Sequence, residues 1–261
     1  MEIKKMINKS LITCSVILVL AIIFKLNICS TNTTKNSTKT ATKSHHFSGL
    51  IFVKNDAANN YSFADEALPR NNAKVDRKMR LTLKKHNYQN TQTNLLHAKA
   101  ERLFPVIEPI LAEYGIPNDF KYLPLVESGL KEGTSPKGAR GLWQFMPGTA
   151  RSYGLKVGKG KDERLNIRKA TIAACKYLND LHDEFGSWTL AAAAYNNGSV
   201  KLAKAMRAQN KVNYFRMNLN KETGAYVYKL IAMKEIIGEP VKYGYSALYA
   251  YQPLPQFLAV N

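Results

Sequence analysis

Apolar side chains recur every three or four residues from about residue 94 onward, and this is the clearest pattern in the chain. In the first such stretch, the positions that share one face are Leu103, Ile107, Ile110, Leu111 and Tyr114. This spacing predicts an amphipathic helix. Gly115 directly follows and is expected to close the helix, because glycine readily takes the left-handed backbone of a helix end.

Further helical segments follow along the chain. We predict them over 117–129, 147–153, 167–185 with Asn166 as N-cap, 188–196 with Ser187 as N-cap, 200–208 and 222–237. Residues 136–139 predict a turn, residues 141–145 have no helical period, and no alternating pattern of strand length is present. Residues 93–245 are therefore predicted to form an all-α domain with at most a minimal β-hairpin, followed by a C-terminal tail over 246–261.

A different pattern marks the first 29 residues. A basic start precedes an uncharged apolar stretch over residues 10–24, which is typical of a secretory signal peptide. The stretch is shorter than the roughly 20 residues of a membrane span, but Lys25 can snorkel and lengthen it. The residues before Cys29 loosely resemble a lipoprotein cleavage site, although Ile28 is bulkier than the pattern expects. We predict export, with residues 1–29 as signal peptide or membrane anchor, and cleavage, anchoring and lipidation stay open.

The segment between this leader and the helical domain is polar and basic. Residues 30–47 are almost all Ser, Thr, Asn and Lys, so they bury too little apolar surface to fold. A basic run over 74–85 is interpreted as a solvated helix, for which a nucleic-acid role is a weak alternative and a surface-adhesion role is at least as good. Residues 30–92 are therefore predicted to be a largely flexible basic linker.

Composition and charge narrow the classes of protein. The chain has 261 residues, 45% of them hydrophobic, which excludes disorder throughout, and its three Cys exclude a small disulfide scaffold. The formal net charge is +19, which attracts polyanions in general. Because residues 1–100 hold 16 Lys and Arg against 5 Asp and Glu, much of the excess lies outside the helical domain. No nucleic-acid motif is present, so no specific nucleic-acid partner is expected.

One carboxyl group has a setting that suits acid–base chemistry. Glu127 follows an apolar stretch and lies near the predicted end of its helix. Apolar surroundings and the negative end of a helix dipole both raise a carboxyl pKa, and a glycosidase needs such a general acid. On position alone, an exposed carboxylate at a helix end is the more common case. The five His are scattered and no phosphate-binding loop is present, so neither metal nor cofactor is expected.

Four sequence blocks give Glu127 a wider context. In chain order they read YLPLVESGL, SPKGARGLWQFMPGTARSYGL, AAAAYNNG and KETGAYVYKL. Together they resemble the family 1, SLT-type, lytic transglycosylases, and most of all their membrane-bound type D subgroup. These are bacterial cell-wall enzymes with a lysozyme-like, goose-type fold. The resemblance runs from about residue 116 to 243.

The resemblance implies a role for nine residues. Glu127 is implied as the catalytic acid and base. The implied substrate-binding residues are Ser128, Ser135, Gln144, Met146, Tyr195, Asn196, Glu222 and Tyr226. Trp143 departs from the Met most common in the family and is expected to pack in the core or groove wall. Taken singly, Tyr195 also suits a core tyrosine and Asn196 a helix cap.

The resemblance also implies a reaction. The bond between MurNAc and GlcNAc in peptidoglycan strands would be cleaved without water, with Glu127 as sole acid and base, to give 1,6-anhydro-MurNAc ends. The expected protein is a monomer of the bacterial cell envelope, periplasmic or anchored in the membrane facing the periplasm. Alternatives are a goose-type lysozyme that hydrolyses the same bond, and a peptidoglycan-binding protein without activity.

Overall fold

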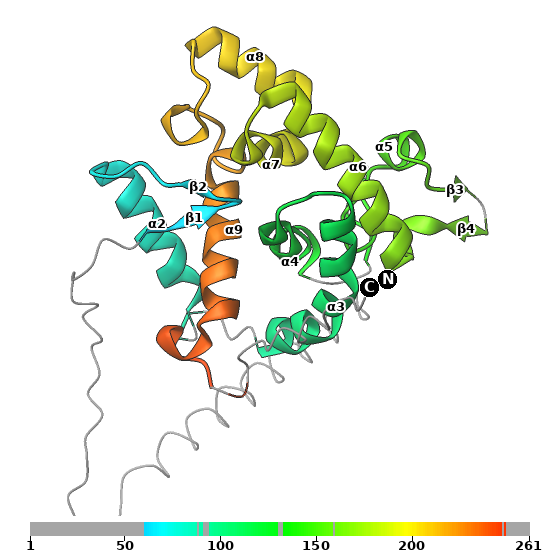
Figure 1. Cartoon of the computed structure of the whole chain (residues 1–261), viewed down its shortest axis with the longest axis horizontal. Coiled ribbons are helices and arrows are strands. Elements are labelled where there is room, and N and C mark those ends of the chain that lie inside the picture. The colour runs from blue at the N-terminus through cyan, green and yellow to red at the C-terminus, as the bar shows by residue number, and fades with distance from the viewer. Residues whose placement is uncertain are drawn as a thin grey trace, which may run out of the picture. The chain divides into compact units, whose positions relative to one another are not determined.

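The computed structural model describes residues 60–87, 89–90, 94–129, 133–158, 160–246 and 248 (Figure 1). Helices form most of this part of the chain. The α-helices are α2 Ala73–His86, α3 Asn94–Glu113, α4 Leu123–Ser128, α5 Pro147–Ser152, α6 Ile167–Phe185, α7 Trp188–Asn197, α8 Ser199–Gln209 and α9 Thr223–Gly238. Short 3₁₀ segments cover Asn118–Tyr122, Glu163–Leu165, Tyr214–Arg216 and Pro240–Tyr243.

The strands are minimal. β1 (Ser62–Phe63) pairs with β2 (Glu66–Ala67), and β3 (Val157–Gly158) pairs with β4 (Lys161–Asp162), both antiparallel. The predicted all-α class is confirmed, although the described residues hold two such hairpins instead of at most one.

The predicted helix ends are largely confirmed by their caps. The Asn166 side chain accepts from the Lys169 amide at 2.9 Å at the start of α6, and Ser187 Oγ accepts from the Leu190 amide at 3.3 Å at the start of α7. Gly186 ends α6 in the left-handed region with φ 63°. These local bonds satisfy backbone groups that a helix end leaves without partners.

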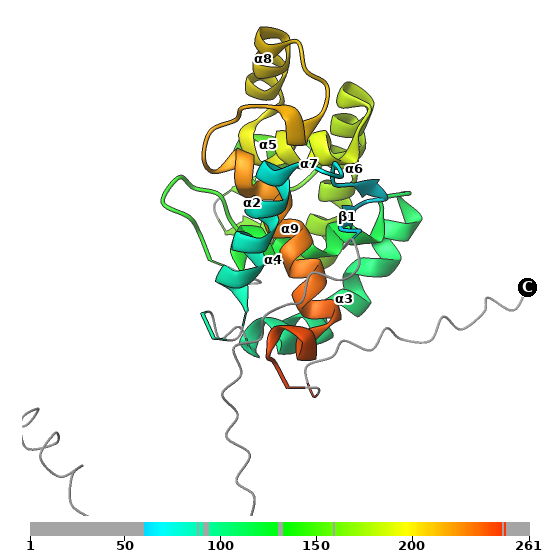
Figure 2. The same cartoon turned by 90° about the vertical axis from the view of Figure 1, so that its left-hand side faces the viewer.

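Helix α9 is the centre of the packing. It is buried on all sides, which is the mark of a helix inside a core. Its buried side chains are Thr223, Tyr226, Val227, Tyr228, Leu230, Ile231, Ala232, Met233, Ile236 and Ile237. Helices α2, α4 and α7 all pack against it, and Figures 1 and 2 show α2 and α4 beside it. Helices α4 and α7, which carry Glu127 and Tyr195, are therefore both held against this buried helix.

The prediction of a flexible linker over residues 30–92 is wrong for residues 60–87. Instead of a flexible segment, they form β1, β2 and α2, and α2 packs on α9. Val75, Met79 and Leu83 recur every fourth residue and are buried, and Lys78 Nζ donates to the Gly224 carbonyl. The prediction of a linker rested on the many Lys and Arg residues of this segment and overlooked the apolar residues that recur at helical spacing among them. The solvated helix predicted over 74–85 therefore exists, but one of its faces belongs to the core.

The remaining N-terminal predictions fall on other residues. Residues 1–59, which include the leader and the first part of the linker, lie outside the described residues, as does most of the tail over 246–261. Within the described ranges, no helix combines the length and the apolar character that a membrane crossing requires.

A long-range cap ties the N-terminal hairpin to the rest of the fold. The Glu66 carboxylate accepts from the backbone amides of Trp188 and Thr189, the latter at 3.2 Å. It also accepts from the hydroxyls of Thr189 at 2.6 Å and Ser187 at 2.8 Å. A negative charge at the N-terminus of α7 is favoured by the helix dipole.

We predict that Glu66→Ala lowers the free energy of unfolding by about 2 kcal/mol, because four donors at the N-terminus of α7 lose their acceptor. Chemical denaturation of the full chain measures this change. The control is Glu101→Ala, which removes an exposed carboxylate from α3 and is expected to have little effect. Equal stability of the two variants would contradict the cap.

Candidate active site

Glu127 lies in the last turn of α4. Leu123, Pro124 and Leu125 of the same helix are buried, whereas Glu127 is only half-buried. Gly129 follows in the left-handed region at φ 58°, and its amide donates to the Leu125 carbonyl at 3.1 Å. The predicted helix end is confirmed, and it sets the carboxyl beside carbonyl groups that carry partial negative charge.

Tyr226 holds one oxygen of this carboxyl. It lies on α9, is 2% exposed, and its hydroxyl donates to Glu127 Oε1. Burial and the charge of Glu127 raise the pKa of Tyr226 well above its ordinary value, so the phenol keeps its proton and remains a donor. Among the described residues no donor reaches Oε2, so that oxygen is available for a proton.

Four influences act on the acidity of Glu127. Burial is the largest and raises its pKa, because it disfavours the charged form. The hydrogen bond from Tyr226 lowers the pKa, the charge of Glu222 raises it, and the charge of Lys229 lowers it. The net direction is upward, as a general acid near neutral pH requires.

Tyr195 makes a different contact from the one implied for it. Its hydroxyl donates to the Trp143 backbone carbonyl at 2.7 Å. Burial and then the charge of Glu127 raise the pKa of Tyr195 well above its ordinary value, so its ring lies within the field of that carboxyl. The Trp143 side chain is fully buried and its Nε1 donates to Thr171 Oγ1 at 3.0 Å, which confirms a core position for Trp143.

The segment over 141–145 is a tight loop. Gln144 has φ 49°, and its side-chain amide donates to the carbonyls of Gly141 at 2.8 Å and Gly133 at 3.3 Å. Gly141 has φ 78°, and a Cβ there would lie 2.0 Å from the Arg164 carbonyl oxygen. Only glycine fits that approach. Met146, at the end of the loop, is 44% exposed.

A polar network joins the ends of α7 and α9. Asn196 Nδ2 donates to Glu222 Oε1 at 3.4 Å, and Thr223 Oγ1 donates to Asn196 Oδ1 at 3.0 Å. Two other implied residues make only local contacts: Ser128 Oγ donates to the Pro124 carbonyl at 3.0 Å, and Ser135 Oγ accepts from the Ala139 amide at 3.1 Å. Of the residues that the resemblance implied, Tyr226, Tyr195 and Glu222 are linked to Glu127 by a bond or a charge.

Two further groups belong to the site, although the sequence analysis gave them no role. Lys229 lies three residues after Tyr226, one turn along α9, and acts on the acidity of Glu127. Arg164 donates to the carbonyls of Phe145 at 3.0 Å and Gly138 at 2.9 Å. The helical spacing from Tyr226 could have indicated Lys229, whereas the contacts of Arg164 are long-range and do not follow from local pattern.

The arrangement suits acid–base chemistry by protein side chains. Within the described ranges, His, Cys, Asp and Glu residues form no group of three that is placed to hold a metal ion. The features that are present define a class of protein: an all-α domain with one carboxyl of raised pKa, one oxygen of which is held by a buried tyrosine.

Comparison with known families agrees with this description. Residues 105–218 match the family described as transglycosylase SLT domain. This part of the chain is therefore similar to a transglycosylase SLT domain, and the resemblance that the four sequence blocks indicated is confirmed.

Individual relatives cover this region. The membrane-bound lytic murein transglycosylase D of Escherichia coli K12 is 34% identical over 135 residues, which are 49% of this chain and 30% of that protein. A putative tributyltin chloride resistance protein of Alteromonas is 31% identical over 127 residues, which are 46% of this chain and 61% of that protein. The chain thus spans less than two thirds of either relative.

Solved structures include the 70 kDa soluble lytic transglycosylase of Escherichia coli. It is 22% identical, with a TM-score of 0.41, and the match covers 49% of this chain and 23% of that chain.

Because folding raises the pKa of Glu127, the native state binds more protons than the unfolded state between the unfolded and folded pKa values. The stability that Glu127 contributes therefore falls as pH rises through this window. We predict that the melting temperature of Glu127→Gln, relative to that of wild type, increases by about 3 °C when the pH is raised from about 4 to about 7. The matched control, Glu101→Gln, changes an exposed carboxyl of α3 and is expected to show no such gain. A constant difference for Glu127→Gln would contradict the raised pKa.

Proposed function

We propose that this chain is a peptidoglycan lytic transglycosylase that cleaves the MurNAc-β-1,4-GlcNAc bond without water and leaves 1,6-anhydro-MurNAc ends. The observation that carries the proposal is the half-buried Glu127 carboxyl, whose pKa is raised by burial and whose Oε1 accepts from Tyr226. The SLT domain match over residues 105–218 supports the same class of reaction.

In the first half of the reaction Glu127 acts as the acid. Because Tyr226 donates to Oε1, the proton of the neutral carboxyl resides on Oε2, which faces no protein donor among the described residues. Oε2 passes this proton to the oxygen that leaves with GlcNAc as the glycosidic bond breaks. The N-acetyl group of MurNAc stabilises the positive charge that develops on the anomeric carbon.

In the second half the same group acts as the base. The Glu127 carboxylate takes the proton of the MurNAc 6-hydroxyl, and the 6-oxygen bonds to the anomeric carbon. The proton that Glu127 donated is thereby recovered, so one carboxyl is sufficient for the whole cycle. Tyr226 and Lys229 lower the pKa of Glu127 and stabilise the carboxylate between the two halves, while burial favours the acid. This balance suits a group that must change roles.

The remaining residues of the predicted set are proposed to hold the glycan strand. Gln144 donates both of its contacts through Nε2, which leaves Oε1 to accept from a sugar hydroxyl. Met146 is exposed and offers an apolar contact to a sugar face. Asn196, Glu222, Ser128 and Ser135 complete the proposed substrate-binding set.

One observation favours a hydrolytic alternative. Glu222 is exposed, and its charge raises the pKa of Glu127, so a second carboxylate lies within electrostatic reach of the acid. A goose-type lysozyme would use such a group to activate water. Because Glu222 is engaged with Asn196 through Oε1, we favour a substrate-holding role for it.

We further propose that the protein acts in the bacterial cell envelope. The basic and apolar pattern of residues 1–29 supports export, with cleavage or membrane anchoring, and the net charge of +19 suits an anionic wall polymer.

We predict that Glu127→Gln lowers the release of soluble fragments from peptidoglycan at least about 100-fold, because the amide neither gives nor takes the proton. Circular dichroism checks that the fold is retained. Glu222→Gln is the discriminating variant and is expected to lose far less activity. An equal collapse of both variants would favour the hydrolase, and unchanged activity of Glu127→Gln would refute the assignment.

We predict that Tyr226→Phe moves the basic limb of the pH profile of kcat/KM to higher pH. In wild type the hydrogen bond from Tyr226 lowers the pKa of Glu127. Without this bond the pKa is higher, so Glu127 stays neutral up to a higher pH. The maximal rate is expected to fall about tenfold, because the carboxylate between the two halves loses a charge-assisted bond. Tyr228→Phe on the same helix is the control. If the basic limb of the pH profile does not move, Tyr226 does not affect the pKa of Glu127 through a hydrogen bond.

A further inference from the structure

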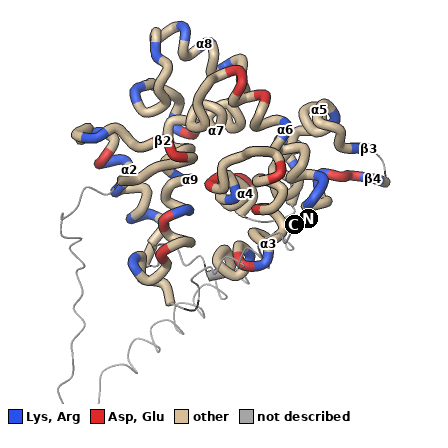
Figure 3. Tube along the Cα trace, viewed as in Figure 1, with Lys and Arg blue, Asp and Glu red and all other residues tan. Residues whose placement is uncertain are grey.

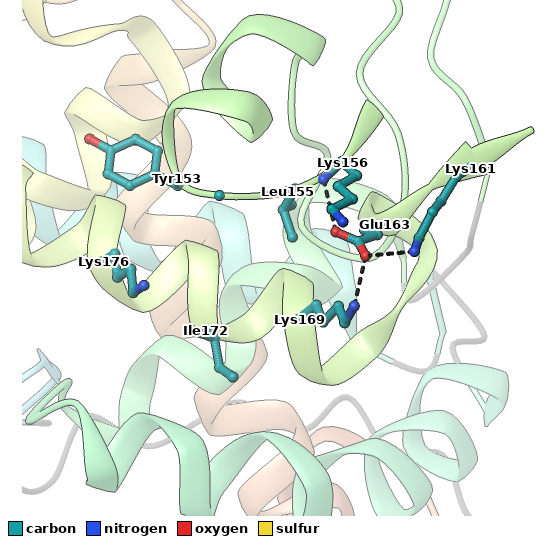
Figure 4. Close-up of a pocket in the computed structure, with 9 residues that line it drawn as sticks. Tyr153, Leu155, Lys156, Lys161, Glu163, Lys169, Ile172 and Lys176 are labelled. Carbon is teal, nitrogen blue, oxygen red and sulfur yellow. Dashed lines mark hydrogen bonds and ion pairs between the residues drawn. The ribbon is translucent and has the colours of Figure 1, made fainter. Parts of the chain in front are cut away.

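A basic pocket lies apart from the candidate site, because neither α4 nor α9 contributes to its lining. It has a volume of about 290 Å³ and opens between residues 153–156, the β3–β4 hairpin and α6 (Figure 4). Four lysines line it, Lys156, Lys161, Lys169 and Lys176, together with the single carboxylate of Glu163.

The charges of this pocket do not cancel. Glu163 accepts from Lys169 Nζ at 2.7 Å and from the Lys156 backbone amide at 2.8 Å, with Lys161 Nζ at 3.6 Å. The hydrogen bond from Lys169 is the largest influence that lowers the pKa of Glu163, to about 2. Glu163 therefore stays charged and pairs with Lys169 and Lys161, but it supplies one negative charge against four ammonium groups. In the described part of the chain, Lys156 Nζ and Lys176 Nζ have no anionic partner, so the pocket keeps a positive surplus for an anion.

The β3–β4 hairpin, which forms one side of this pocket, also contacts the loop of the candidate site. Asp162 pairs with Arg140 at 3.1 Å and with Arg164 at 2.7 Å. Arg164 in turn donates to the Phe145 carbonyl at 3.0 Å. The hairpin that carries Lys161 is therefore fixed to the loop that carries Gln144, and Figure 3 shows acidic and basic residues beside one another at β4.

A row of tyrosine rings joins the two places. The ring centroids of Tyr153 and Tyr177 lie 5.0 Å apart, and those of Tyr177 and Tyr195 lie 5.3 Å apart. Tyr153 lines the pocket, and the charge of Glu127 acts on Tyr195. Two ring contacts therefore join Tyr153 of the pocket to Tyr195, on which the charge of Glu127 acts.

We propose that this pocket binds a carboxylate of the peptide stems carried by peptidoglycan strands, so that the chain prefers strands with stems over bare glycan. The inference rests on the proposed function. In such a strand the amino sugars are N-acetylated and neutral, and the stems carry the negative charge. Ammonium groups on long side chains act as point charges that suit carboxylates of variable orientation.

The test uses the full chain with Lys156→Glu and Lys176→Glu together. Neither ammonium holds an ion pair in the described structure, so the fold is expected to survive. The matched control reverses two exposed lysines of α8, Lys201→Glu and Lys204→Glu. Substrates are soluble strands that carry stems and the same strands after an amidase removes the stems, which leaves one lactyl carboxylate beside each MurNAc ring and no stem carboxylate.

For stem-bearing strands we expect the pocket variant to raise KM about fivefold, the size expected for two partly exposed charge contacts, and to leave KM for stripped strands unchanged. The control variant is expected to change neither value by as much. An equal rise of KM on both substrates, or no rise on stem-bearing strands, overturns the proposal.

A second readout does not depend on turnover. Free tetrapeptide stem is titrated into isotope-labelled protein, and the amide signals of residues 153–156 and 161–163 are followed by NMR. We expect these signals to shift in wild type and the shifts to vanish in the pocket variant. Absence of shifts in wild type refutes the pocket. A chain that binds the peptide but cleaves neither substrate refutes the proposed function and leaves the pocket standing.

Discussion

The hydrogen bond from Tyr226 to Glu127 is the contact on which the site depends. It joins the most buried helix, α9, to the C-terminal end of the short α4, which has only six residues of its own. Because α2, α4 and α7 all pack on α9, the position of the phenol is set by the whole core. Among the described residues, one oxygen of this carboxyl is held and the other meets no donor, which suits acid–base chemistry at a single group.

The electrostatics follow from the same contact. Burial pushes Glu127 toward its neutral form, while the Tyr226 hydroxyl and the Lys229 charge favour the carboxylate. Neither influence alone would suit a group that first gives and then takes a proton. The proposed anion pocket adds a separate region of positive charge, tied to the same loop through Asp162 and Arg164. In this account the chemistry and the preference for a strand are carried by different residues on one rigid frame.

The sequence predicted what depends on local pattern. Helix caps such as Asn166 and Ser187 act within three residues, and the Glu127 helix end follows from an apolar run and a glycine. Long-range contacts were beyond such reasoning. The bond of Glu66 with α7 spans more than a hundred residues, and the apolar period of α2 was hidden among lysines and arginines. For the same reason the contact of Tyr226 with Glu127 was not predicted, and its substrate contact stays a prediction.

The most direct test of the account is the mass of the soluble products after the full chain digests peptidoglycan. If Glu127 alone serves as acid and then base, the 6-oxygen of MurNAc closes on the anomeric carbon. The fragments then end in 1,6-anhydro-MurNAc and are lighter by one water than the reducing form. Fragments with reducing MurNAc ends would contradict the account, because water would have been the nucleophile and a second carboxylate would be required.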